Sequence, residues 1–265
     1  MKYKGLTLVE LVTVIAVTAI LIAVLFPALQ SSKNYARSVM CSQNIRQIML
    51  GLFAYESQNS ALPFGFDSTL EYPPPQGYAG SGIIDESGWW WFNLLQSYFD
   101  KAGGRGQVPC CPSKKVTDLR LENNILCGNY GLNQSICKDS KKRKSRAEFT
   151  GKSLNSSDIS RPSETLLVAD SGYGLINWWH VTEKPPGRLD NTIRDMSYIP
   201  GMTINIDKKL WPGTEEDAIK GRHPGKKVNI GFADGHTARM KADDLLVEKT
   251  DTGYKNLSPL WSPAK

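Results

Sequence analysis

A single apolar run near the N-terminus constrains this chain more than any other feature. Residues 6–29 carry one charged side chain, Glu10. A helix of that length spans roughly 36 Å at ~1.5 Å per residue, which is enough to cross a hydrocarbon core of ~30 Å. Lys2 and Lys4 precede the run and favour a cytoplasmic N-terminus. The run is too long for a secretory signal peptide and ends without an A-x-A-like site, so we expect one transmembrane helix.

Glu10 is the unusual residue of this run. A carboxylate placed in hydrocarbon is costly, ~2.5–3.5 kcal/mol for Asp on insertion scales, so an acidic residue there is a functional candidate. Cleavage between Gly5 and Leu6 would give Leu6 a free amine. That amine could pair with Glu10 of a neighbouring subunit, which would neutralise both charges and fix the register between subunits. We therefore predict that Glu10 acts in assembly.

Residues 4–29, KGLTLVELVTVIAVTAILIAVLFPAL, resemble the N-terminal cleavage and methylation motif of type IV prepilins and type II secretion pseudopilins. Leu6 stands where that motif most often has Phe. The resemblance implies cleavage after Gly5 by a prepilin peptidase, N-methylation of Leu6, and other pilin or pseudopilin subunits as partners. It also implies a single-pass protein of the bacterial inner membrane with an extracytoplasmic head. A plain, uncleaved membrane anchor is the alternative.

The amphipathic pattern that follows extends the expected helix. Ile45, Ile48, Met49, Leu52 and Phe53 recur at i, i+3, i+4, i+7 and i+8. We therefore expect a leader over residues 1–5, a helix over residues 6–58 and a head over residues 59–265. Residues 62–88 are rich in Pro, Gly and Tyr and predict a long loop. The aromatic run at 89–92 opens a short helix and is expected to lie in the core, because tryptophan buries a large area.

The head shows strand patterns typical of an antiparallel sheet. Residues 166–170 predict a buried strand. Val228, Ile230 and Phe232 alternate with polar or small residues, so we expect them to share one face and to pack against the N-terminal helix. Asp234 and Gly235 predict a two-residue hairpin turn. The expected fold is α+β and pilin-like, a long helix packed on an antiparallel sheet with long loops.

The chain has five cysteines. Cys110, Cys111, Cys127 and Cys137 cluster, whereas Cys41 stands alone on the expected helix. Paired C-x-x-C spacing is absent from the sequence, which disfavours a zinc ribbon. An extracytoplasmic head favours disulfides. We expect at least one among the four clustered cysteines, or one between Cys41 and this group that links the helix to the head.

The sequence offers little support for an enzyme. It has three histidines and lacks the G-x-S-x-G, H-E-x-x-H and P-loop motifs, so we expect no catalytic residues and no cofactor. His223, Asp234 and His236 could share a metal. We instead expect them to stabilise the hairpin, because the two histidines should lie at opposite ends of a strand, roughly 20 Å apart. Calcium is a further possibility, and its candidate loop ligands are Asp170, Asp190, Asp195 and Asp207.

Charge gives a weak indication of partners. The formal net charge is +6, and residues 138–146, KDSKKRKSR, form a basic run. A solvated loop is the expected structure. Nucleic acid is not an expected partner, because the net charge is modest and the run contains no aromatic residue. Binding of an acidic polysaccharide or another anionic polymer by a membrane-tethered head is the alternative function.

A second resemblance covers most of the head. It rests on CSQNIRQI at 41–48, CPS at 111–113, NYGLN at 129–133, RPSET at 161–165, and RH at 222–223 followed by FADGH at 232–236. This series is similar to the prepilin-type, processing-associated family named for its H-x9-DG motif, which is related to DUF1559 proteins. Ten residues, not nine, separate His223 from Asp234. The resemblance implies no chemistry for the head, so the expected function is a structural or assembly subunit of a pilus or pseudopilus.

Overall fold

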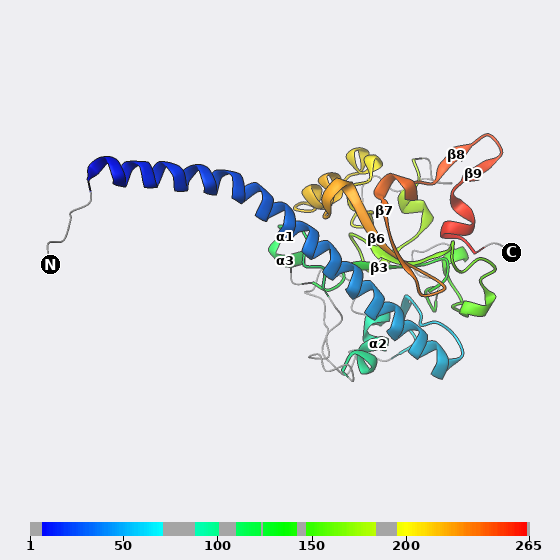
Figure 1. Cartoon of the computed structure of the whole chain (residues 1–265). Coiled ribbons are helices and arrows are strands. Elements are labelled where there is room, and N and C mark those ends of the chain that lie inside the picture. The colour runs from blue at the N-terminus through cyan, green and yellow to red at the C-terminus, as the bar shows by residue number, and fades with distance from the viewer. Residues whose placement is uncertain are drawn as a thin grey trace.

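The computed structural model shows a long helix packed on a mostly antiparallel sheet, which confirms the expected α+β, pilin-like arrangement (Figure 1). The structure describes residues 7–70, 88–100, 110–122, 124–141, 147–183 and 195–263. The predicted cleavage site at Gly5 and Leu6 lies outside these residues, as do most of the predicted loop at 62–88 and most of the basic run.

Helix α1 (Leu8–Asn59) is continuous. Thr7 caps its N-terminus, and Ser60 ends it with a left-handed φ of 57° and a backbone N–H donated to the carbonyl of Glu56. Pro27 lies inside the helix without interrupting it. The N-terminal half of α1 projects away from the head, whereas the C-terminal half lies along it (Figure 1).

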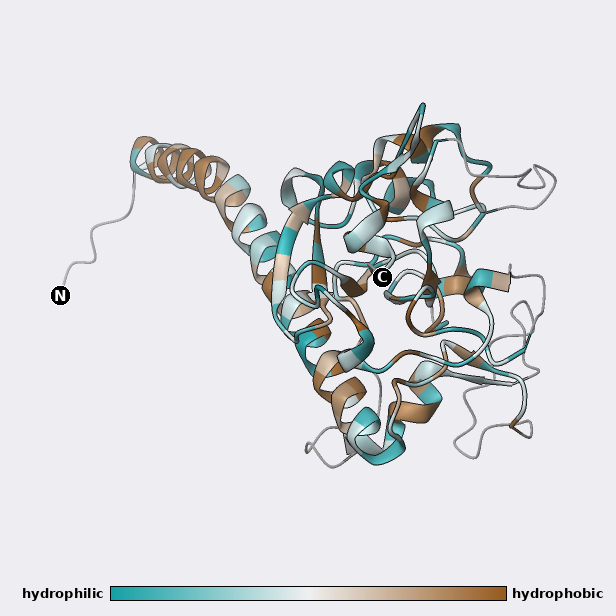
Figure 2. Cartoon of the chain, turned by 90° about the vertical axis from the view of Figure 1, so that its right-hand side faces the viewer, coloured by the Kyte–Doolittle hydropathy of each residue, from teal (hydrophilic) through white to brown (hydrophobic). Residues whose placement is uncertain are grey.

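The projecting half of α1 carries the apolar run. In the part of the chain that the structure describes, α1 alone is long and apolar enough to span a membrane, and its most apolar window is not buried by the rest of the protein. In Figure 2 the ribbon of this half is coloured mostly as hydrophobic. Burial begins at Ser38 and continues through Leu52, where α1 contacts the head. The same helix therefore has an exposed apolar half and a half that is packed against the head.

A five-stranded sheet forms the centre of the head, in the order β5-β3-β4-β6-β7. Its strands are β3 (Tyr130–Asn133), β4 (Leu166–Asp170), β5 (Leu175–Ile176), β6 (Lys227–Phe232) and β7 (Thr237–Lys241). Neighbouring strands are antiparallel, except that β3 and β5 are parallel. The predicted buried strand is β4, and all five of its residues are buried. Helix α1 packs on β4, β6 and β7.

The β6–β7 hairpin differs from the predicted two-residue turn. The backbone N–H of Phe232 donates to the carbonyl of His236, so three residues, Ala233 to Gly235, lie between the paired positions. Gly235 has a φ of +94°, as expected for a glycine at this turn. A three-residue loop that closes on a left-handed residue is the next commonest hairpin connection after the two-residue loops.

The sheet has a hydrophobic core on each side, and this corrects one prediction. Val228, Ile230 and Phe232 share one face as expected, but they belong to the core that lies away from α1. The opposite face of β6 meets the helix. A Cβ built on Gly231 would lie 2.8 Å from the Sδ of Met49, so the absence of a side chain at Gly231 allows α1 to approach the sheet closely.

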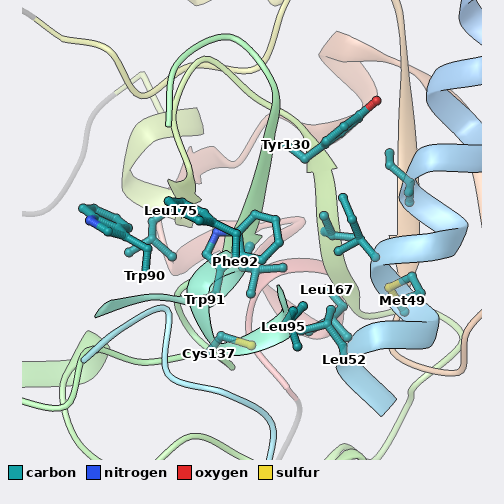
Figure 3. Close-up of a cluster of buried hydrophobic side chains, with 14 of the residues drawn as sticks. Met49, Leu52, Trp90, Trp91, Phe92, Leu95, Tyr130, Cys137, Leu167 and Leu175 are labelled. Carbon is teal, nitrogen blue, oxygen red and sulfur yellow. The ribbon is translucent and has the colours of Figure 1, made fainter. Parts of the chain in front are cut away.

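The core beneath α1 contains the aromatic run. Trp90, Trp91 and Phe92 are buried, which confirms the expected core position, and the indole N–H of Trp91 donates to the carbonyl of Gly174 at 2.8 Å. In Figure 3, Phe92 and Leu95 lie between Trp90 and the part of α1 that carries Met49 and Leu52. Helix α2 (Trp91–Asp100), to which Trp91 and Phe92 belong, packs against the C-terminal half of α1.

The core on the other side is closed by the C-terminal segment. Trp261 is fully buried there, its indole N–H donates to the carbonyl of Leu245, and its own carbonyl accepts from the amide of Asn133. The remaining helices and strands are α2 (Trp91–Asp100), α3 (Leu119–Glu122), β1 (Phe66–Asp67), β2 (Trp89–Trp90), β8 (Glu248–Thr250) and β9 (Gly253–Lys255). Short helical turns lie at Ala147–Phe149, Ser156–Asp158, Trp178–Val181, Thr203–Asp207, Glu216–Lys220, Pro224–Lys226, Ala242–Leu245 and Leu257–Trp261.

Candidate functional site: a buried cysteine, histidine and aspartate cluster

Four reactive side chains meet between α1 and the sheet. Cys41 lies on α1, Cys111 on the segment that leads to α3, Asp170 at the end of β4, and His223 just before β6. One sulfur, nitrogen or oxygen atom from each lies within 4.8 Å of those of the other three, and all four residues are buried. We call this group the Cys-His-Asp cluster. It joins α1 to three separate parts of the head.

The two cysteines come from opposite sides of the cluster. Cys41 shares the buried face of α1 with Ile45 and Ile48, at the i, i+4, i+7 spacing of a helix that packs on a core. The backbone N–H of Cys111 donates to the side-chain oxygen of Asn129 at 3.0 Å. The amide of Asn129 donates in turn to the carbonyl of Cys127, so the loop that carries Cys111 is fixed to the start of β3.

The two sulfur atoms are in close contact. The Sγ atoms of Cys41 and Cys111 are 2.8 Å apart in the interior. Burial, followed by the hydrogen bond with Cys41, raises the pKa of the Cys111 thiol well above its usual value. This thiol is therefore neutral at physiological pH, and as a thiol it is a poor nucleophile and a poor metal ligand.

His223 and Asp170 form the polar half of the cluster. The Nε2 atom of His223 lies 3.0 Å from Oδ2 of Asp170. Asn229 donates to the same oxygen twice, from its backbone N–H at 2.7 Å and from its side chain at 3.1 Å. Burial alone would lower the pKa of His223, but hydrogen bonds to Asp170 and Cys111 outweigh it and raise this pKa to about 9. The imidazole is therefore charged at neutral pH and faces a carboxylate.

A buried ion pair supports the cluster from the side. The guanidinium of Arg222 lies 2.7 Å from Oδ2 of Asp217, and both side chains are fully buried. Arg222 also donates to the carbonyls of Asn129 and Ser171, each at 2.7 Å. Loss of one member of such a pair leaves an uncompensated charge in the interior. The pair thus holds the Cys111 loop, the end of β4 and the residue before His223 in one arrangement.

The donor set allows two kinds of chemistry. Two sulfurs, one imidazole nitrogen and one carboxylate oxygen are ligands that zinc accepts in tetrahedral sites. Two adjacent cysteines can instead form a disulfide. Among the residues that the structure describes, Oδ1 of Asp170 and Nδ1 of His223 are buried and have no hydrogen-bond partner.

The other predicted hairpin residues form a separate pair. Nδ1 of His236 lies 2.6 Å from Oδ1 of Asp234, at the far end of β6 from His223. The two histidines therefore lie at opposite ends of β6, as expected. Asp170, one of the candidate calcium ligands, does not lie in a loop but ends the buried strand β4, where it binds His223.

The remaining calcium candidates do not form a site in the part of the chain that is described. Asp190 lies outside the described residues. Asp195 and Asp207 belong to no group of three or more potential ligands among the residues that the structure places. The carboxylate of Asp195 instead accepts from the backbone N–H of Ser197 and pairs with Lys208.

The remaining cysteines stay separate from the cluster. Cys41, Cys111, Cys127 and Cys137 are free thiols in this structure. Cys110 is exposed, whereas Cys127 and Cys137 are buried, and burial raises the pKa of Cys127 to about 12. The structure thus brings together Cys41 and Cys111, the helix-to-head alternative among the pairings considered from the sequence. The disulfide itself stays a prediction.

Glu10 has a local role that the sequence analysis missed. The backbone N–H of Thr7 donates to Oε2 of Glu10 at 2.9 Å, and the backbone N–H of Glu10 donates to Oγ1 of Thr7 at 3.2 Å. This reciprocal arrangement is a capping box, which satisfies two N–H groups at the start of α1. Thr7 followed by Glu10 at the start of an apolar run was the available sequence signal.

The motifs of the head converge on the cluster. Cys41, Cys111, Asn129 and the Arg222-His223 pair come from four of the motifs noted in the sequence, and all lie at or beside it. Residues 30–103 match the family described as protein of unknown function (DUF1559). The matched segment holds the head-associated half of α1, with Cys41, and α2. Searches of curated proteins and of solved structures gave no match.

Proposed function

We propose that this chain is a prepilin-like subunit of the bacterial inner membrane. In this proposal a prepilin peptidase cleaves it after Gly5 and methylates Leu6. Residues 6–29 then anchor it with its N-terminus in the cytoplasm and its head outside. The mature protein assembles with other pilin or pseudopilin subunits into a pilus or a type II secretion-like pseudopilus. The head needs no catalytic residues for this role.

The observation that carries the proposal is the division of α1 into two halves. The apolar half is exposed along its whole length, and the other half is built into the head core. Such a helix has no use for its apolar half in an isolated, water-soluble protein. Lipid can cover it in the membrane, and helices of neighbouring subunits can cover it in a fibre.

The head-associated half of α1 also presents apolar residues outward. Tyr35, Val39 and Leu50 are exposed by 54%, 56% and 64%. At ~100° per residue they fall within about 60° of one another on the helix. Gln43 and Arg46 are exposed between Val39 and Leu50 on the same side, so this side of α1 is mixed apolar and polar. Because exposed apolar residues that share a face can mark an interaction surface, we assign this side of α1 to contacts with neighbouring subunits.

The capping box at the start of α1 is compatible with a role for Glu10 in assembly. The hydrogen bonds between Thr7 and the carboxylate use Oε2 of Glu10. A carboxylate can accept bonds at both oxygens, so the methylated amine of Leu6 from a neighbouring subunit can bind Glu10 without breaking the cap. The cap would hold the carboxylate in place before the neighbour arrives.

The test is mass analysis of the N-terminal peptide of the protein isolated from membranes, with and without an active prepilin peptidase. We expect a mature chain that begins at methylated Leu6 only when the peptidase is active. A Gly5→Val variant should keep the leader under both conditions and serves as the matched control. A native chain that still begins at Met1 in the presence of the peptidase would contradict the proposal.

A further inference from the structure

We propose that Cys41 and Cys111 form a disulfide that fastens the membrane helix α1 covalently to the head. The proposal deepens the proposed function and rests on it for one point, the location of the head outside the cytoplasm, where disulfides persist. Every other step comes from the contacts in the Cys-His-Asp cluster.

The first step is the short distance between the two sulfur atoms and their burial. The two Sγ atoms are 2.8 Å apart, closer than the ~3.5–4.0 Å at which even carbon atoms pack. Cys41 is fully buried and Cys111 is 5% exposed. Asn44, one turn after Cys41, also donates to the carbonyl of Cys110 at 3.0 Å, so the helix and the cysteine loop are held together beside the sulfurs.

The second step is the comparison with a metal. Two thiolates at ~2.3 Å from a tetrahedral zinc would lie about 3.8 Å apart, wider than the contact in this cluster. Oδ2 of Asp170 already accepts three hydrogen bonds, one from His223 and two from Asn229. The positive charge of the His223 imidazole balances the negative charge of this carboxylate. A disulfide leaves that arrangement intact. A zinc ion bound to both sulfurs would instead move the two sulfurs apart and replace their protons.

The third step is the chemistry. Formation of the bond removes two protons and two electrons from the pair of thiols. We assign the electrons to a disulfide of the extracytoplasmic thiol–disulfide oxidase class, which is reduced to a dithiol as the Cys41–Cys111 bond forms. One thiolate attacks the oxidase disulfide, and the second then attacks the mixed disulfide and releases the oxidase. Because both sulfurs are buried in the folded head, this exchange precedes the docking of α1.

The disulfide would give the N-terminal helix a second covalent connection to the head, in addition to the peptide backbone. The linked cysteines are 70 residues apart in sequence, and the segment between them contains α2 and the aromatic core. Cleavage of the chain anywhere between the two cysteines would therefore leave the fragments joined until a reductant is added.

The experiment is disulfide mapping of the full-length protein from membranes, after thiols are blocked in denaturant without reductant. We expect a peptide with Cys41 joined to one with Cys111, and its loss on reduction. The matched variants are Cys110→Ser, which should keep this link, and Cys111→Ser, which should abolish it. Mapping of the unmodified chain decides the question even if Cys111→Ser fails to fold.

Three outcomes are distinguishable. If both Cys41 and Cys111 carry the blocking group and the native protein contains one zinc per chain, the cluster is a metal site and the disulfide proposal is wrong. Blocked cysteines without metal, in a chain that begins at Leu6, would overturn the disulfide alone. Blocked cysteines in a chain that still begins at Met1 would count against the proposed function as well, since the location of the head would then be in question.

Discussion

The charged pair in the Cys-His-Asp cluster should make the stability of the head depend on pH. The folded state raises the pKa of His223 from 6.5 to about 9. A raised pKa of a base contributes stability that is fully present below pH 6.5 and is lost as the pH rises through 9. At ~1.4 kcal/mol per pKa unit the contribution is about 3 kcal/mol, and most of it remains at pH 7.

Few other groups near the cluster obscure this titration. The Cys111 sulfur does not titrate in this range, because burial raises the pKa of its thiol well above the usual value and the proposed disulfide has no proton to lose. The Arg222 guanidinium, held by Asp217, stays charged. His180 has a pKa lowered to about 4 by burial, and its effect on stability therefore falls below pH 6.5, outside the range of His223.

The assay is urea unfolding of the full-length protein in detergent at several pH values from 6 to 10. The comparison is with His223→Gln, which keeps a hydrogen-bonding side chain but cannot titrate. The unfolding free energy of the unmodified protein should fall by about 2–3 kcal/mol more than that of the variant between pH 7 and pH 10. Parallel losses in the two proteins would refute the assignment of a charged His223.

Two further predictions concern α1. Gly231→Ala should destabilise the head by about 1–3 kcal/mol, because the new Cβ would lie 2.8 Å from the Sδ of Met49. Gly51→Ala, with its nearest contact an ordinary 3.4 Å from Phe99, should be neutral or gain up to ~1 kcal/mol of helix propensity, and equal effects in urea unfolding would contradict the close packing of helix and sheet. Glu10→Gln and Glu10→Leu should both insert into the membrane yet be absent from sheared fibres, since neither offers a carboxylate to the amine of Leu6. Because glutamine can also complete a capping box, normal assembly of Glu10→Gln alone would show that the cap, not the charge, is what matters.

Local patterns predicted the elements of this fold better than their arrangement. The apolar run and the i, i+3, i+4 spacing located α1, and alternation located β6. Alternation also grouped Val228, Ile230 and Phe232 correctly on one face. It could not show which face the helix covers, because the sheet has a core on both sides and the larger side chains fill the one away from α1. Gly231 was the indication of close approach, and a single glycine in a strand permits several interpretations.

The candidate site was harder to predict from the sequence than the fold. The motifs that carry Cys41, Cys111 and His223 were noted in order along the chain, but their convergence depends on the docking of α1 and on the order of the strands. A cysteine on a helix and one in a loop 70 residues later have no local signal that pairs them. The capping role of Glu10 was predictable from the sequence, because Thr7 stands three residues before Glu10 at the start of an apolar run.

The position of Trp261 has a consequence for how the head is made. This residue, close to the C-terminus, closes the core on the side of the sheet away from α1. If the head is exported in chain order, as under the proposed function, this core cannot form until the segment that carries Trp261 has crossed the membrane. Until then β4 and β6 lack their cover on one face, and exposed strands of this kind are prone to aggregate. Under the proposed function we therefore expect export to depend on chaperones that bind the unfinished sheet.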